Sequence, residues 1–221
     1  MDFAEARRRM VDSQIRPNRV TDARVLAAMG EVPREEFVPE LLRGVAYVDE
    51  DIEIGERRYL MEPLLLARLL QGVELKPSDV VLDIGCGTGY TPAVVARLVS
   101  TVVALECDAE IARRANQNLI ELGIDNAAVI EGPLAQGYPE HAPYDVIFLS
   151  GGVATLPPGL IEQLAEGGRL IGVFRGADGV GRARMVVRQG GLSVAHELFN
   201  AATPLLPGFE TEPEFVFQGP G

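Results

Sequence analysis

The chain is poor in several residue types that mark particular classes of protein. Its 221 residues include two cysteines, two histidines and no tryptophan. Two cysteines are too few for a disulfide framework, so we expect free thiols in a reducing compartment. No apolar run is long enough to span a membrane, and residues 1–9 are charged and lack the apolar core of a secretory leader. These absences predict a soluble, cytoplasmic protein with no membrane partner.

Positive charge is also scarce. Twenty Lys and Arg residues stand against 32 Asp and Glu residues, which gives a net charge of −12. Because no basic stripe appears, the sequence argues against a nucleic-acid partner. We assign no metal site, and we expect His141 and His196 to be turn and strand residues and not catalytic bases.

The apolar pattern predicts an α/β fold. Helical spacing covers residues 3–15 and 21–29, with Thr21 or Asp22 as the N-cap of the second helix, and Pro63 opens a helix at about 64–70. Beyond these, strands and helices alternate, which indicates a parallel sheet with helices on both faces. The expected strands are 80–84, 101–105, 127–130, 144–149 and 169–174, and the expected helices between them are 92–99, 109–122 and 157–165.

The last predicted strands depart from this alternation. Residues 183–188 and 192–199 flank a Gln-Gly-Gly turn and are typical of an antiparallel hairpin. A mainly parallel sheet that ends in such a hairpin is the layout of Rossmann-like class I methyltransferases. We therefore divide the chain into an N-terminal helical segment on the substrate side (1–75), a Rossmann-like cofactor domain (76–208) and a loosely held tail (209–221).

Residues 80–90, Val-Val-Leu-Asp-Ile-Gly-Cys-Gly-Thr-Gly-Tyr, carry the most informative motif. An apolar strand leads to Asp83 and then to three glycines at the start of a helix. Glycine allows a positive φ and lets the backbone approach a ligand closely. Nucleotide-binding α/β folds are built in this way.

Two details favour S-adenosylmethionine (SAM) over a dinucleotide. Tyr90 stands where a dinucleotide motif needs its third glycine, and the carboxylate of Asp83 suits a ligand with a positive amino-acid end. Glu106 ends the next apolar run, about where an acid takes ribose hydroxyls. We expect Cys107 and Leu134 to flank the adenine. The predicted cofactor-binding residues are Asp83, Gly85, Cys86, Gly87, Gly89, Tyr90, Glu106, Cys107 and Leu134.

Nearly all of the chain resembles the protein L-isoaspartate O-methyltransferases. The similar segments are 10–16 (Met-Val-Asp-Ser-Gln-Ile-Arg), 21–26, 32–39 (Val-Pro-Arg-Glu-Glu-Phe-Val-Pro), 46–47, 83–90, 138–145, 157–158 and 164–170. The resemblance implies methyl transfer from SAM to the abnormal carboxylate of isoaspartyl residues, which begins the repair of aged proteins. The implied partner is a protein or peptide that carries isoaspartate.

One loop departs from the family pattern. The family has Gly-Gln-Thr-Ile-Ser-Gln-Pro where this chain has Arg-Arg-Tyr-Leu-Met-Glu-Pro at 57–63. Met61 stands at the position of the Ser that positions the acceptor, and a thioether cannot donate a hydrogen bond. We therefore assign no catalytic residue. An ionised carboxylate acceptor needs no base, whereas an amine or phenol would, with Tyr59 and Glu62 as the nearest candidates.

A second departure lies at Pro133, where the family usually has an Asp that accepts from the adenine amino group. Pro133 supplies neither carboxylate nor N–H. Arg57 and Arg58 lie in the loop expected to face the methyl group, and we interpret them as attracting an anionic acceptor, although a solvated charged loop explains them as well. Two other functions stay open: a methyltransferase of this ancestry with a different acceptor, such as a small molecule, and a SAM-binding protein without turnover.

Overall fold

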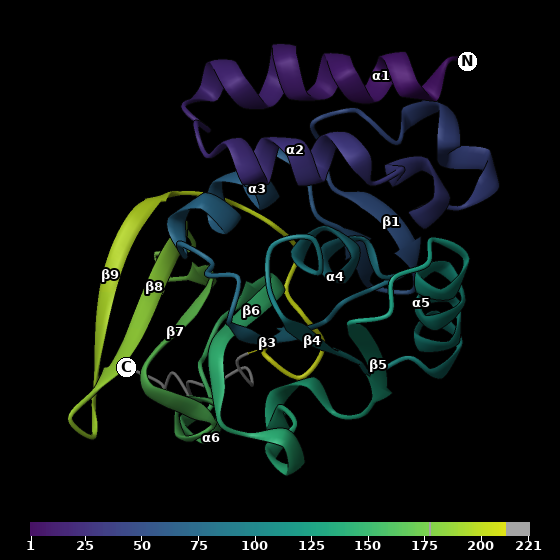
Figure 1. Cartoon of the computed structure of the whole chain (residues 1–221). Coiled ribbons are helices and arrows are strands. Elements are labelled where there is room, and N and C mark those ends of the chain that lie inside the picture. The colour runs from purple at the N-terminus through teal and green to yellow at the C-terminus, as the bar shows by residue number, and fades with distance from the viewer. Residues whose placement is uncertain (177, 211–221) are drawn as a thin grey trace, which may run out of the picture.

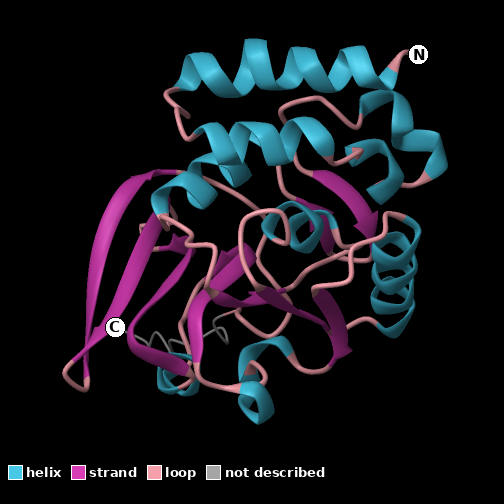
Figure 2. Cartoon of the chain, viewed as in Figure 1, coloured by secondary structure: helices cyan, strands magenta, loops and turns pink. Residues whose placement is uncertain are grey.

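A seven-stranded sheet forms the centre of the fold in residues 1–176 and 178–210, which the computed structural model describes (Figures 1 and 2). Its strands lie in the order β5-β4-β3-β6-β7-β8-β9. The first five of these run parallel to one another, and β8 and β9 are added antiparallel at one edge. The predicted fold class is thus confirmed. The bounds are β3 Val80–Ile84, β4 Thr101–Glu106, β5 Ala127–Glu131, β6 Tyr144–Val153, β7 Leu164–Arg175, β8 Gly181–Gln189 and β9 Leu192–Asn200.

Strand β3 lies between β4 and β6 and is paired in parallel with both. Its residues 81–84 are buried, because helices cover both faces of the sheet, and this explains the unbroken apolar run in the sequence. Asp83 lies opposite Ala104 of β4 and Phe148 of β6. The carboxyl ends of the three strands therefore meet at one edge of the sheet, where ligands bind in open α/β folds.

Six α-helices occur in the described residues. Their bounds are α1 Phe3–Arg9, α2 Ala23–Glu31, α3 Pro63–Gly72, α4 Tyr90–Val95, α5 Ala109–Glu121 and α6 Pro158–Glu162. Asp22 caps α2 as predicted, since its carboxylate accepts hydrogen bonds from the backbone N–H groups of Arg24 and Val25. Figure 1 shows α1 and α2 side by side at the top of the view, and α2 contacts α3 and α4 below it.

The N-terminal segment contains irregular turns as well as helices. A π-helical turn, Met10–Ile15, continues α1, and 3₁₀ turns cover Arg34–Phe37 and Glu40–Val45. Between these turns and α3 lies a two-stranded antiparallel hairpin, β1 Ile52–Gly55 and β2 Arg58–Leu60, which the sequence analysis did not predict. Strands of four and three residues give too short an alternation to be recognised in the sequence.

Several predicted bounds need correction. The helix expected over 92–99 begins at Tyr90 and ends at Val95, and the helix expected over 157–165 ends at Glu162. Strand β7 begins at Leu164, well before residue 169, because Tyr144 pairs with Leu164 before the register shifts. Gly167 and Gly168 lie at this irregularity and interrupt the apolar pattern in the sequence. The strand nevertheless continues through the bulge.

The apolar core has two large parts and a small third cluster of Cys86, Ala104 and Ala115. The larger cluster extends from Met10 and the N-terminal helices to Ile171 and Ala183 in the sheet, and the smaller one covers the opposite face around Leu149 and Phe174. No helix in the described part of the chain has both the length and the apolar character that crossing a membrane requires. Residues 211–221 of the predicted tail lie outside the described residues, whereas Phe209 is 1% exposed and belongs to the smaller cluster.

Candidate functional site

The glycine motif forms a tight turn between β3 and α4. Gly85, Gly87 and Gly89 have φ values of 80°, 56° and 99°, a region that side-chain-bearing residues rarely adopt. The N–H groups of Gly85 and Cys86 donate to the carbonyl of Leu105, at 2.8 and 3.1 Å, so the turn folds back onto β4. This geometry explains why the sequence has glycine at each of the three positions.

Glu106, at the end of β4, lies beside this turn and is fully buried. Its carboxylate accepts hydrogen bonds from the N–H groups of Gly87 (2.8 Å), Cys107 (2.9 Å) and Asp108 (3.3 Å). Burial alone would raise the pKa of Glu106, but the hydrogen bonds and charge of Arg58, with the backbone donors, outweigh it and lower the pKa. Glu106 is therefore an ionised acceptor at the end of β4, where the sequence predicts a ribose-binding acid.

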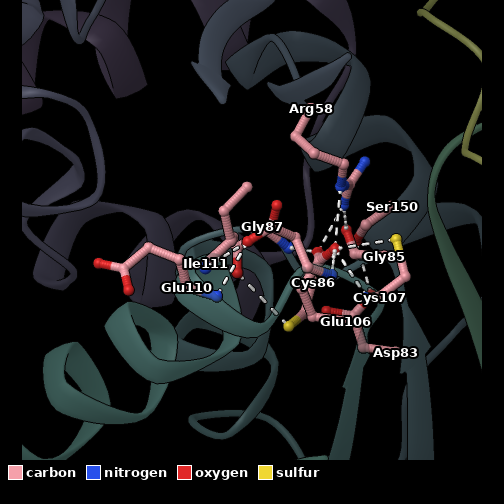
Figure 3. Close-up of polar contacts among 11 residues, drawn as sticks. Arg58, Asp83, Gly85, Cys86, Gly87, Glu106, Cys107, Glu110, Ile111 and Ser150 are labelled. Atoms are coloured by element: carbon pink, nitrogen blue, oxygen red, sulfur yellow. Dashed lines mark hydrogen bonds and ion pairs between the residues drawn. The ribbon is translucent and has the colours of Figure 1, made fainter. Parts of the chain in front are cut away.

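Arg58 of β2 occupies both oxygens of that acceptor (Figure 3). Its Nε lies 3.1 Å from Oε1 of Glu106, its Nη2 lies 2.7 Å from Oε2, and the same Nη2 donates to the carbonyl of Gly85 at 2.8 Å. The side chain is 4% exposed. Such bidentate, charge-assisted pairs are the strong ion pairs of proteins.

Asp83 lies at the same edge and is fully buried. Its Oδ1 accepts a hydrogen bond from the hydroxyl of Ser150 at 2.6 Å, while Oδ2 has no partner among the described residues. Burial raises the pKa of Asp83 to about 7, with Ser150 opposing this shift and Glu106 adding to it. Ser150 was not predicted as a site residue, although its place after the apolar run of β6 puts it beside the end of β3.

Apolar side chains cover the glycine turn. A Cβ built on Gly85 would lie 2.5 Å from Cδ2 of Leu206, and one built on Gly87 would lie 2.7 Å from Cδ1 of Ile54. Leu206 comes from the segment after β9, and Ile54 from β1. The space above the glycines, where the backbone would approach a ligand, is thus filled by this chain's own side chains.

The other predicted cofactor residues have different surroundings. Cys86 is buried, and burial raises the pKa of its thiol. Cys107 is exposed as a residue, but its thiol is partly buried and lies 3.4 Å from Oε1 of Glu106. The partial burial and the charge of Glu106 raise the pKa of the thiol to about 11. Leu134 is buried in the smaller core cluster.

Tyr90 points into the core of the N-terminal half. Its ring meets the ring of Phe37 edge-on at 5.4 Å between centroids, and the guanidinium of Arg34 lies 4.8 Å from its centre. Tyr90 therefore packs beneath the turn against Phe37 and Arg34, two contacts that the sequence did not predict.

The donor set suits the predicted cofactor. Glu106 offers two acceptor oxygens for ribose hydroxyls, and the unpartnered oxygen of Asp83 suits a positive amino group. Both acids lie at the carboxyl ends of adjacent parallel strands, beside a glycine turn. The residues thus fit SAM in chemistry, provided that Arg58, Ile54 and Leu206 move away.

A pocket of about 560 Å³ opens beside this site. Arg57 and Tyr59 of the β1–β2 hairpin line it on one side, and Arg175 of β7 lines it as well. Arg57 forms an ion pair with Glu210 at the pocket. The remaining lining residues are Asp51, Ala202, Thr203, Pro204, Leu205 and Glu210.

The structure separates the two arginines that the sequence analysis grouped. Arg57 lines the pocket, whereas Arg58 lies on Glu106. Met61 is 3% exposed and packs in the larger core cluster, and its carbonyl accepts from Arg34 at 2.8 Å. Burial, with Asp49 and Asp51 nearby, raises the pKa of Glu62 to about 7, but Glu62 does not line the pocket. The described residues contain no cluster of His, Cys, Asp or Glu suited to a metal ion.

Comparisons with known proteins agree with the sequence resemblance. Residues 5–196 match the family described as protein-L-isoaspartate(D-aspartate) O-methyltransferase. A protein-L-isoaspartate O-methyltransferase of Methanoculleus marisnigri is 40% identical over 184 residues, which cover 83% of this chain and 84% of that protein. One of the same name from Roseiflexus sp. is 42% identical over 171 residues, 77% of this chain and 78% of the other.

Solved structures have the same fold. A protein-L-isoaspartate O-methyltransferase aligns with a TM-score of 0.80 at 29% identity, over 91% of this chain and 66% of that one. A Plasmodium falciparum protein in complex with S-adenosyl-L-homocysteine (SAH) aligns with a TM-score of 0.77 at 21% identity, over 92% and 97% of the two chains. The second likeness concerns the fold alone.

Proposed function

The chain belongs to the protein-L-isoaspartate(D-aspartate) O-methyltransferase family, and on that premise we propose that it transfers a methyl group from SAM to the side-chain carboxylate of isoaspartyl residues. The acceptor would be a protein or peptide that carries this damage, in the cytoplasm. The observation that carries the proposal is the position of Glu106 at the glycine turn, beside a pocket lined by arginines.

The cofactor would be held by groups at the edge of the sheet. Glu106 would accept hydrogen bonds from the ribose hydroxyls, and Asp83 would take the amino group of the methionine portion. The glycine turn provides the backbone surface between them. Cys107 and Leu134 remain the residues that we place beside the adenine.

The acceptor carboxylate would bind in the neighbouring pocket. Arg57 and Arg175 line it and supply positive charge, and the acceptor carboxylate would replace Glu210 as the partner of Arg57. The pocket shares a wall with the cofactor site, because Leu205 lines the pocket and the adjacent Leu206 covers Gly85. A carboxylate drawn to the arginines would therefore lie close to the cofactor.

For methyl transfer to a carboxylate, the main task of the protein is to position the two reactants. When bound, SAM supplies an electrophilic methyl group on a sulfonium. A carboxylate with a pKa of about 4 is ionised at neutral pH, so no side chain has to remove a proton from it. Holding the two reactants in line supplies much of the acceleration in such a displacement. Met61 at the family's Ser position is compatible with this reaction, since its side chain packs in the core.

The test uses SAM with a labelled methyl group and a pair of peptides that differ only in one linkage. One peptide carries an isoaspartyl residue, and its control carries a normal aspartyl residue at the same position. The proposal expects label in the first peptide alone, in a base-labile form typical of a methyl ester. Label in neither peptide, or in both equally, would contradict it.

A second candidate function is SAM binding without turnover. Met61 favours it, because a thioether at the family's Ser position cannot donate the hydrogen bond that positions the acceptor. The same labelled reaction separates the two functions. Binding of SAM without transfer to the isoaspartyl peptide or to a cell extract would support this second function, and a labelled small molecule would indicate a different acceptor.

A further inference from the structure

The ion pair between Arg58 and Glu106 lies inside the proposed cofactor site. Two N–H groups of one guanidinium donate to the two oxygens of Glu106, at 3.1 and 2.7 Å. A ribose presents two neighbouring hydroxyls to such an acid in the same manner. Arg58 thus takes the hydrogen bonds that a nucleoside would make.

The site cannot hold both partners at once. Glu106 is fully buried, and its remaining contacts come from the backbone N–H groups of Gly87, Cys107 and Asp108 and from the thiol of Cys107. Arg58 also donates to the carbonyl of Gly85 in the glycine turn. A nucleoside that reaches Glu106 must therefore displace the guanidinium.

The hairpin that carries Arg58 is a separate sheet. β1 and β2 pair only with each other, so no strand hydrogen bonds tie them to the seven-stranded sheet, although Ile52 and Leu60 pack in the larger core cluster. Its turn contains Arg57 at a φ of 56°, which is strained for a residue with a side chain. Figure 1 shows β1 beside α5, and Gly55 of β1 lies against Ile111 of that helix.

The base of the hairpin is held firmly. The N–H of Glu62 donates to Asp51 at 3.0 Å, and Arg34 donates to the carbonyl of Met61 at 2.8 Å. Any displacement of the hairpin would therefore involve residues 52–60, which carry Ile54 and Arg58 over the glycine turn. The same residues carry Arg57 and Tyr59, which line the neighbouring pocket.

We propose that Arg58 is a built-in competitor of the nucleoside, so that the cofactor binds only when residues 52–60 swing away and Glu106 exchanges the guanidinium for ribose hydroxyls. This inference rests on the proposed function, because it takes the ligand to be SAM or its product. The exchange also moves Arg57 and Tyr59, and so cofactor binding reshapes the acceptor pocket. Arg58 in this role sets cofactor affinity without touching the bound cofactor.

The test measures the binding of SAH by calorimetry to the full chain and to Arg58→Gln. A ligand that must first open a closed state binds more weakly by the fraction of molecules that are open. We expect Arg58→Gln to bind SAH about tenfold more tightly or better, and Arg58→Met provides a second variant that keeps an apolar stem. Unchanged or weaker binding in the variants, or no binding to any form, would overturn the proposal.

Arg169→Gln is the matched control. Arg169 is also a largely buried arginine that pairs with a carboxylate, Asp79 at 2.6 Å, and donates to backbone carbonyls, but it lies away from the glycine turn. Its variant loses a comparable ion pair and should bind SAH as the unchanged chain does. Tighter binding in this control would show that general loosening explains the effect and would overturn the role of Arg58.

Hydrogen exchange gives a readout independent of affinity. Saturating SAH should speed exchange at the backbone amides of residues 52–60 in the unchanged chain, because the hairpin is displaced. Slower exchange there would overturn the proposal. Tight SAH binding by Arg58→Gln without methylation of the isoaspartyl peptide would leave this inference standing and would defeat the proposed function. Methylation of the isoaspartyl peptide, with unchanged SAH affinity in Arg58→Gln, would support the proposed function and would overturn this inference.

Discussion

At the scale of single residues, Asp83 is an energetically unfavourable group in the site when it is ionised. A carboxylate is costly to bury without partners, and one oxygen of Asp83 has none among the described residues. The rise of its pKa to about 7 expresses that cost. The sequence predicts the position of Asp83 from the motif, but not the shift, because Ser150 and the burial come from the fold.

The shift predicts how stability depends on pH. The pKa of Asp83 is about 7 in the folded chain and 3.8 ordinarily, so its contribution is complete below about pH 4 and is lost as the pH rises through 7. Between about pH 5 and about pH 8 the unfolding free energy should fall by roughly 2–3 kcal/mol from this group. Urea unfolding of the chain and of Asp83→Asn measures the difference.

Asp83→Asn isolates this effect from a second one. Glu62 also has a pKa raised to about 7, and it stays in the variant. Some pH dependence should therefore remain in Asp83→Asn, with a smaller slope than in the unchanged chain. Equal slopes in the two proteins would show that Asp83 is ionised at low cost.

The pocket arginines give a prediction about the acceptor. Replacing Arg57 and Arg175 by Gln removes two positive charges from the wall of the pocket. We expect KM for the isoaspartyl peptide to rise by about tenfold or more, since a charge-assisted contact is worth about 1.5–3 kcal/mol. The Kd of SAH should stay the same, and a KM that does not change would exclude this role. Arg184→Gln, a surface arginine paired with Glu197, is a control for lost charge.

At the scale of elements, the β1–β2 hairpin shows what the sequence could not predict. Periodicity identified the long sheet strands, because buried parallel strands are continuous apolar runs. The hairpin has only seven strand residues, with charged side chains among them, and its burial arises from contacts with distant residues such as Glu106 and Ile111. Arg57 and Arg58 therefore appeared equivalent in the sequence and differ in the structure.

Arg34 joins three elements and gives a prediction about stability. It donates to the carbonyl of Ala46 at 2.6 Å and to that of Met61 at 2.8 Å, and it lies over the ring of Tyr90. Arg34→Met would leave both carbonyls without this donor, and we expect a loss of about 2–4 kcal/mol, measured by urea unfolding. Arg43→Met removes a more exposed arginine nearby and should cost about 0.5 kcal/mol. Similar losses in the two variants would contradict the role of Arg34.

At the scale of the whole molecule, the sequence predicts the architecture well and the division into segments remains a prediction. The alternation of strands and helices, the antiparallel end and the family resemblance all came from the residues and are confirmed. The sequence could not predict which side chains fill the cofactor site. Ile54, Arg58 and Leu206 come together there only through tertiary packing.

The larger core cluster predicts a single unfolding transition. It joins residues from Met10 through the sheet to Ala183, so the N-terminal segment and the sheet share one core. Circular dichroism at helix wavelengths and tyrosine fluorescence should lose signal at the same urea concentration. The five tyrosines lie in both the N-terminal segment and the cofactor domain, so their summed fluorescence follows both. Two steps in that signal, or transitions that differ between the two probes, would show that the segment unfolds by itself.

The pairing of Glu106 within the chain has a practical consequence for handling the protein. A buried carboxylate without partners is costly, so an empty nucleoside site with an unpaired acid would favour retention of a ligand through purification. Here that charge is already neutralised, so the protein should emerge from purification without a nucleoside. With five tyrosines and no tryptophan, its ultraviolet spectrum would reveal even a small amount of carried-over adenine.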